Sequence, residues 1–347
     1  MPLSVPVFKK TKKGSIADSI SIGLDIGSYA VTAVVLRHRN DIVELVDILH
    51  ACATVDTSAF LSPLKPILEK AHLHIALGGV GTVLRYVVFP RLNPQELLQS
   101  LKFEAQKHIP FPLEQMSMDT HILREDLSES KMLVLLAAVK TEVLQQRLDL
   151  LKKADLFPAV VDLEPLSLVN ACMHASCFEK SAAHTVASLH VGHTFSMVTI
   201  IEKGIPALSR DIPVGGKHIT QRLSDLLHVE TRQAQTIKDT APVEHVQVVA
   251  QALDGMLVHL AGELRSSFDY YESQNSTSIG TIFISGGVTL MSGFSEKLSS
   301  LLGLPVQEWD PFTGIVITAA QREKLTRKMM ACAPIALGLA LRSQGSP

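Results

Sequence analysis

The sequence is poor in aromatic residues and in cysteine. Of its 347 residues, 5% are aromatic and four are cysteine. Cys172 and Cys177 stand five positions apart, whereas Cys52 and Cys332 lie far away in the chain. Zinc sites usually combine several cysteine and histidine ligands at short, regular spacings, so these cysteines do not indicate one. We expect four reduced thiols, as in proteins of a reducing cytoplasm.

The sequence also lacks any long apolar run. The longest, such as residues 132–139, contain about eight residues, whereas a helix that crosses a membrane needs roughly twenty. The N-terminus carries a basic cluster made of Lys9, Lys10, Lys12 and Lys13. No hydrophobic segment follows this cluster, so it does not resemble a signal peptide. We expect a basic flexible tail over residues 1–15, with a weak contact to anionic lipid as an alternative, and no transmembrane segment.

Neither sign of charge dominates. The chain has 32 basic and 34 acidic residues, which gives a formal net charge of −2, and 46% of its residues are apolar. Balanced charge provides no broad field for a nucleic-acid backbone, so we expect no nucleic-acid partner. A chain this long and apolar can bury a substantial core, which excludes disorder. Its length suggests about two domains.

Three glycine-containing turns each follow a strand-like segment. They are Asp25-Ile26-Gly27-Ser28, Val191-Gly192-His193-Thr194 and Ser285-Gly286-Gly287. Turns of this kind expose backbone N–H groups that can bind phosphate oxygens. A carboxylate such as that of Asp25 can orient the waters of a bound Mg²⁺. None of the turns is a Walker loop or a GxGxxG motif, and each alone is equally consistent with an ordinary tight turn.

The first two turns belong to segments that share one pattern. Residues 20–36 and 187–201 both predict a strand, a glycine turn and a second strand. A shift of 165 residues places Asp25 on His190 and Gly27 on Gly192. Such a duplication is expected of a fold with two related lobes around a cleft. Chance remains an alternative, because hairpins with one glycine are common.

A compact α+β unit is predicted between the two halves. Asn93 and Glu96 have the spacing of a helix capping box, and Pro110 ends the helix that they begin. Strands are expected over residues 118–123 and 132–139. Thr141 is expected to cap the next helix. Helices are also predicted over residues 63–71, 141–154, 218–227, 232–240, 243–271 and 333–342.

In this order, the motifs resemble the actin-like ATPase superfamily, and most closely its PilM family, which is related to the division protein FtsA. The resemblance runs from about residue 19 to residue 342. Residues 23–36 and 189–201 look like the two phosphate loops, and residues 284–294 look like the adenosine motif. The most specific match is FEAQKHIPFPLEQMSMD at residues 103–119. It is similar to the PilM signature, in which a helix ends in an Ile-Pro-Phe-Pro turn.

The resemblance implies an α/β, actin-like (ribonuclease H-like) fold with two lobes, a nucleotide cleft and an inserted α+β subdomain. The first lobe would span residues 16–180, with the insertion at about 86–157. The second would span residues 181–332, with a subdomain at about 215–278. Residues 333–347 would form a C-terminal helix that returns to the first lobe.

The resemblance also implies ATP and Mg²⁺ as cofactors. The implied nucleotide-binding residues are Asp25, Gly27, Ser28, Tyr29, Gly192, His193, Thr194, Gly216, Gln235, Lys238, Gly286 and Gly287. Asp25 would face the metal. Gln235 and Lys238 match a Glu-x-x-Lys adenosine contact, with glutamine in place of glutamate. Asp162 and Glu164 match hinge-side carboxylates, for which a water-positioning role and a plain interlobe hydrogen bond both stay open.

His190 departs from the family pattern, which has an aspartate here. Mg²⁺ prefers oxygen ligands in octahedral geometry, so an imidazole is a poor replacement. Phosphoryl transfer depends mainly on positioning and charge neutralisation, and the loss of a metal-orienting carboxylate weakens both. We therefore expect weak or lost Mg²⁺ binding, and nucleotide binding with little or no ATPase turnover. His193 is more typical of a turn residue than of a ligand.

The implied function is that of a cytoplasmic scaffold or adaptor in the inner-membrane platform of a type IV pilus or a related type II secretion system. In the PilM family, the N-terminal cytoplasmic tail of the single-pass membrane protein PilN binds in a groove between the inserted module and the first lobe. The chain would reach the membrane through that partner, and the motor ATPase is a further candidate partner. The alternatives are an active ATPase or kinase of the superfamily and an FtsA-like division protein.

Overall fold

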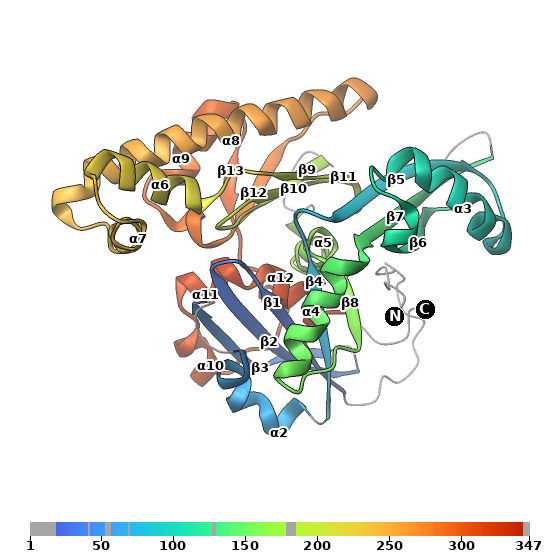
Figure 1. The fold of residues 1–347 in the computed structure, drawn as a ribbon, viewed down its shortest axis with the longest axis horizontal. Helices are drawn as coiled ribbons and strands as arrows, with labels where there is room; N and C mark the ends of the chain where they lie inside the picture. Colours follow the sequence, from blue (N-terminus) through green and yellow to red (C-terminus); the bar gives the residue numbers. More distant parts are fainter. Residues whose placement is uncertain are drawn as a thin grey trace.

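The computed structural model describes residues 19–40, 42–52, 57–68, 70–126, 130–177 and 185–342. The tail predicted at residues 1–15 lies outside these ranges. Two five-stranded sheets and one three-stranded sheet form the framework, with helices packed on them (Figure 1). Within the described ranges, we find no helix with the length and apolar character that a membrane crossing requires. All four cysteines are free thiols.

The first sheet has the strand order β3-β2-β1-β4-β8. Its strands are β1 (Ser19–Ile26), β2 (Ala30–Arg39), β3 (Ile42–Cys52), β4 (Ala71–Leu77) and β8 (Val160–Leu163). β1, β2 and β3 are antiparallel, whereas β4 runs parallel to β1 and to β8. Ile22, Leu24 and Ile75 are fully buried, as expected of strands that are covered on both faces.

The second sheet repeats this topology in the order β11-β10-β9-β12-β13. Its strands are β9 (Thr185–Val191), β10 (Ser196–Glu202), β11 (Ile205–Ile212), β12 (Thr281–Ser285) and β13 (Val306–Glu308). Asp25 lies opposite Thr32 in the first sheet, and His190 lies opposite Met197 in the second. Both pairs are related by the same shift of 165 residues, so the strand register supports the predicted duplication.

Four helices pack beside the second sheet. They are α6 (Gly216–Leu227), α7 (Thr231–Thr240), α8 (Val246–Gln274) and α9 (Phe294–Leu302). Leu253, Leu257, Leu260 and Leu264 recur at helical spacing along α8, and all four are buried against the sheet. This apolar face is what makes so long a helix stable. The first three helices agree with their predicted positions to within a few residues.

The third sheet has the order β5-β7-β6. Its strands are β5 (Thr82–Pro90), β6 (Met116–Arg124) and β7 (Lys131–Lys140), accompanied by α3 (Pro94–His108) and α4 (Thr141–Lys153). The predicted capping box is confirmed. The Asn93 side chain accepts a hydrogen bond from the Glu96 N–H at 3.0 Å, and the Glu96 carboxylate accepts one from the Asn93 N–H at 2.9 Å. The prediction that Thr141 caps α4 was wrong. Thr141 is the first residue of the helix, and Lys140 occupies the N-cap position.

The helix predicted over residues 63–71 was also wrong. The chain forms three short pieces there, namely α1 (Thr57–Leu61), η1 (Ser62–Leu64) and α2 (Lys65–Leu68). Pro63 and Pro66 lack the N–H group that a continuous helix needs, so the segment breaks. Ala71 already belongs to β4.

The last helices that the structure describes pack on the first sheet. They are α10 (Ala319–Lys324), α11 (Arg327–Cys332) and α12 (Pro334–Ala340). α12 packs closely against β1 and against α5 (Glu164–His174). A Cβ atom on Gly23 would lie 1.9 Å from the Ala336 carbonyl oxygen. Only glycine therefore allows α12 to lie this close to β1.

Candidate functional site

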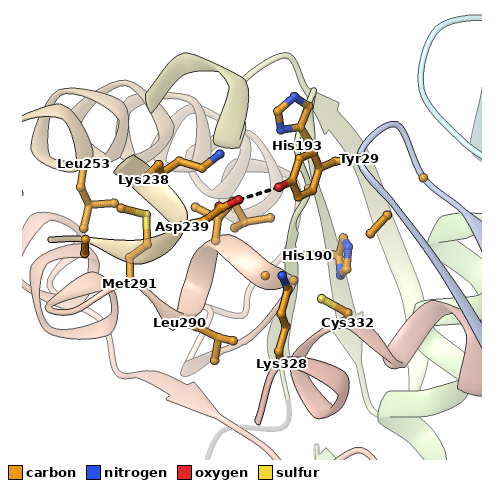
Figure 2. Close-up of a pocket in the computed structure, with 18 of the residues that line it drawn as sticks. Tyr29, His190, His193, Lys238, Asp239, Leu253, Leu290, Met291, Lys328 and Cys332 are labelled. Carbon is orange, nitrogen blue, oxygen red and sulfur yellow. Dashed lines mark hydrogen bonds between the residues drawn. The ribbon is translucent and has the colours of Figure 1, made fainter. Parts of the chain in front are cut away.

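A cavity of about 800 Å³ lies where the ends of β1, β9 and β12 meet (Figure 2). The turns after β1 and β9 form one side of it, while α7, α8, α11 and the short helix η5 (Gly287–Leu290) supply the rest. Nine of the twelve residues predicted to bind nucleotide line this cavity: Asp25, Gly27, Ser28, Tyr29, Gly192, His193, Lys238, Gly286 and Gly287. Segments far apart in the sequence thus meet at one site.

The other three predicted residues, Thr194, Gly216 and Gln235, do not line the cavity. Thr194 donates a hydrogen bond to the Ser28 hydroxyl at 2.7 Å, so the turns of the two large sheets touch directly. The Lys238 ammonium donates to the Gly216 carbonyl at 3.3 Å and to the Gln235 side chain at 3.0 Å. Gly216 and Gln235 therefore position Lys238 instead of lining the cavity themselves.

The Gly286-Gly287 turn forms the wall next to β9. Gly286 has φ of +98°, and a Cβ atom there would lie 2.3 Å from the Val191 carbonyl oxygen, so no other residue fits without a shift of the backbone. A Cβ atom on Gly287 would approach only the Cys332 sulfur, at 3.5 Å. The backbone at Gly287 thus leaves room for a flat group to lie against it.

Tyr29 connects the two large sheets across the mouth of the cavity. Its ring stacks on that of His193, with centroids 4.9 Å apart and planes inclined by 23°. Its hydroxyl donates to the Asp239 carboxylate at 2.6 Å (Figure 2). Because Tyr29 follows β1 and Asp239 lies on α7, this bond joins the first sheet to a helix of the second.

Three lysines line the cavity, and they differ in their surroundings. Lys238 is held by the acceptors behind it, and burial lowers its pKa to about 8. Lys297 pairs with Asp254. Lys328 makes no hydrogen bond or ion pair with any residue that the structure describes, and its ammonium points into the cavity on the side of His190 and Cys332 (Figure 2).

The side of the cavity formed by the turns after β1 and β9 does not offer a set of Mg²⁺ ligands. His190 Nδ1 lies 3.0 Å from the Ser285 hydroxyl, and burial lowers the pKa of the imidazole to about 4, so the ring is neutral near pH 7. Burial raises the pKa of Asp25 to about 6, an effect that Arg147 opposes. Within the described ranges, no three His, Cys, Asp or Glu side chains come together as a metal site. The glycines and lysines, in contrast, suit anionic oxygens.

The two hinge-side carboxylates have different environments. Asp162 accepts a bond from Arg342 at 2.7 Å, and both side chains are buried. It therefore forms an ion pair at the end of α12 and is not directed at the cavity. Glu164 is half-buried, and its pKa rises to about 8, first through burial and then through the negative charges of Asp25 and Asp211.

Several lining residues were not predicted from the sequence. They are mainly the apolar wall formed by Val246, Val249, Leu253, Leu290 and Met291, together with Asp239, His50 and Lys328. The start of α8 looks like any amphipathic helix, so its sequence does not distinguish a cavity wall from a core contact. The position of Asp239, next to the predicted Lys238, was the clearest available signal.

Known proteins resemble this chain over most of its length. The family model described as Type IV pilus assembly protein PilM matches residues 65–344. The solved PilM-PilN type IV pilus biogenesis complex contains a chain with 21% identity and a TM-score of 0.78, and the match covers 94% of this chain and 98% of that one.

Two further solved structures are more distant. The ethanolamine utilization protein EutJ from Carboxydothermus hydrogenoformans has 16% identity and a TM-score of 0.52, with 95% of this chain and 92% of that chain covered. MreB 5 of Spiroplasma citri bound to AMPPNP has 12% identity and a TM-score of 0.46, with 92% and 94% covered. The chain has the actin-like ATPase fold and belongs to the PilM family of type IV pilus assembly proteins.

Proposed function

We propose that this PilM-family chain is an adaptor of the pilus assembly platform that binds an adenine nucleotide in its cavity and hydrolyses it slowly or not at all. The observation that carries the nucleotide part is the cavity at the ends of β1, β9 and β12. Its volume lies within the range of roughly 300–1,000 Å³ that is common for small-molecule sites. The adaptor part is supported by the family and by the likeness to a PilM-PilN complex.

The two ends of the cavity suit the two ends of a nucleotide. Val249, Leu253 and Met291 belong to an apolar wall that can hold a base. The turns after β1 and β9 and Lys328 form the opposite, polar end (Figure 2), where phosphate oxygens can accept hydrogen bonds. We propose this orientation for ATP or ADP.

Slow turnover follows from the groups at the polar end. Transfer of a phosphoryl group requires a positioned nucleophile and neutralised charge. His190 is neutral and hydrogen-bonded to Ser285, so it offers no carboxylate from the second sheet. Asp25 is the carboxylate that remains at the cavity wall on this side.

Capture of a membrane protein's tail is proposed for the inserted sheet and its surroundings. Val88, Phe103 and Phe157 are large apolar side chains with exposed fractions of 56%, 74% and 69%. They lie on β5, on α3 and just after α4. Exposed apolar side chains beside strand edges suit an extended peptide. Such a partner would hold this cytoplasmic chain at the inner membrane.

Calorimetric titration with ATP tests the nucleotide site. In Gly287→Leu, the backbone has room for the new Cβ, but the side chain enters the cavity, so we expect ATP binding to weaken at least tenfold. Gly262→Leu on the outside of α8 is the matched control, because a Cβ there meets nothing within 4 Å. Equal ATP affinity in the two variants would show that the nucleotide does not bind in this cavity.

Fluorescence anisotropy with a labelled peptide tests the adaptor role. The peptide is the N-terminal cytoplasmic tail of a PilN-like membrane protein from the same organism. We expect Phe103→Asp and Phe157→Asp to weaken its binding, whereas Tyr270→Asp, an equally exposed position on α8, leaves it unchanged. Failure of the unmodified chain to bind at high micromolar concentration would argue against the adaptor role.

A further inference from the structure

The neutral imidazole of His190 in the second sheet takes the place of the Asp25 carboxylate in the first sheet. Asp25 and His190 occupy equivalent positions, one residue before the end of β1 and of β9. The His190 ring is fixed by Ser285, which lies 3.0 Å from Nδ1. A divalent cation placed between the two turns would thus find an oxygen ligand on one side and an imidazole on the other. This donor set suits Mg²⁺ poorly.

A fixed cation also stands near the remaining carboxylate. Arg147 on α4 donates a hydrogen bond to the carbonyl of Ile26, the residue after Asp25, at 3.2 Å. Its positive charge acts on the Asp25 side chain. Since like charges repel, Arg147 opposes a second cation at Asp25. The negative charge that would attract a metal is already partly compensated by the protein.

Lys328 is available to a ligand. Lys238 donates to Gly216, Thr220 and Gln235, and Lys297 is paired with Asp254. Lys328 has no such partner among the residues described, and it points into the cavity from α11 (Figure 2). An ammonium group is a compact point charge, and its hydrogen bonds to phosphate oxygens are strong.

We infer that Lys328 supplies the positive charge that a divalent cation supplies in other nucleotide sites, so that this chain binds nucleoside di- and triphosphates without Mg²⁺. The inference rests on the proposed nucleotide binding and specifies how the phosphate chain is recognised. It has two consequences. Affinity depends on the phosphates and on Lys328, and it does not depend on the metal.

The test is calorimetric titration of the full chain with ATP and with adenosine, each in excess Mg²⁺ and in EDTA. We expect the two ATP dissociation constants to agree within about threefold. Lys328→Ala should weaken ATP binding about tenfold in both buffers and leave adenosine binding unchanged. Lys328→Arg keeps the charge and should stay within about threefold of the unmodified chain. Lys324→Ala on α10 is the control, because it removes the same charge outside the cavity.

The outcomes separate the inference from the proposed function. ATP binding in Mg²⁺ that weakens more than tenfold in EDTA would overturn the inference and leave the nucleotide site standing. Equal ATP affinities of Lys328→Ala and Lys324→Ala would also overturn it. If neither ATP nor adenosine binds in either buffer, both the proposed nucleotide site and the inference about Lys328 are refuted.

Discussion

At the scale of single residues, Tyr29 bridges the first sheet and α7 at the edge of the cavity. Its ring lies on His193 and its hydroxyl reaches Asp239, so the side chain spans from the first sheet to α7. A ligand that enters between these elements must separate or pass this contact. We therefore expect the hydroxyl to affect the rate of ligand entry more than the strength of binding.

Tyr29→Phe tests this role, since it removes the hydrogen bond to Asp239 and keeps the aromatic stack. We expect faster association of a fluorescent ATP analogue, by about 2- to 13-fold, because a single hydrogen bond of this kind contributes roughly 0.5–1.5 kcal/mol. Stopped-flow mixing measures the rate. Tyr270→Phe, on the exposed side of α8, serves as the control, and equal rates in the two variants would refute the gating role.

Glu164 makes stability depend on pH. Its pKa rises from 4.5 to about 8, through burial and then through the charges of Asp25 and Asp211, against the opposing charge of Arg147. The folded chain therefore holds this proton more tightly than the unfolded chain does. By linkage, the stabilisation is fully present below about pH 4.5 and is lost as the pH rises through 8.

Thermal denaturation between about pH 5.5 and pH 9 measures this loss. We expect the melting temperature to fall over this range, and to fall less in Glu164→Gln, which cannot ionise. Glu323→Gln on the exposed face of α10 should keep the slope of the unmodified chain. A slope in Glu164→Gln as steep as in that control would show that Glu164 is ionised throughout.

At the scale of elements, the position of α12 depends on small residues. A Cβ atom on Gly338 would lie 1.7 Å from the Ser167 carbonyl oxygen of α5. Overpacking of this kind typically costs about 1–3 kcal/mol. Close contact, and not helix propensity, thus explains a glycine in the middle of α12.

A pair of glycine-to-alanine variants tests that explanation. Gly338→Ala should lower the free energy of unfolding by about 1–3 kcal/mol. Gly262→Ala, where a new Cβ meets nothing within 4 Å, should raise it by about 0.5–1 kcal/mol, because alanine favours the helix. Urea denaturation measures both. Stabilisation by Gly338→Ala would contradict the close contact with α5.

The elements differ in how well the sequence predicts them. α8 and the hairpins at the two related turns have strong periodicity, so their positions follow from local pattern alone. β11 and β13 were not predicted, because short or mixed segments gain their strand conformation from neighbouring strands. Pro63 and Pro66 disfavour one continuous helix over residues 63–71, and the chain forms short helical pieces around them.

Only part of the site was predicted, because only some of its residues have a local sequence pattern. Its glycine turns are visible in the sequence because their geometry restricts the residue type, as at Gly286 with its positive φ. Lys328 was not predicted, because no local sequence motif distinguishes an exposed lysine on a short helix as a binding residue. Its position arises from the return of the chain to the first sheet, where α11 contacts β3 and η5 and places Lys328 at the cavity.

At the scale of the whole molecule, the two related sheets meet at their strand ends, where hydrogen bonds link them. Ser28 with Thr194 and Tyr29 with Asp239 bridge the cavity mouth, and Tyr86 with Ser209 joins the inserted sheet to β11 at 2.9 Å. A nucleotide in the cavity would add contacts to both sheets. A ligand that binds only the folded state raises its stability, so ATP should raise the melting temperature.

Equilibrium dialysis with ATP, followed by ion-exchange chromatography of both chambers, reports binding and turnover together. We expect ATP to accumulate with the protein and to remain ATP over hours, as for a PilM-family adaptor that holds a nucleotide without hydrolysing it. Equal nucleotide concentrations in the two chambers, or rapid conversion of the bound ATP to ADP, would contradict this function.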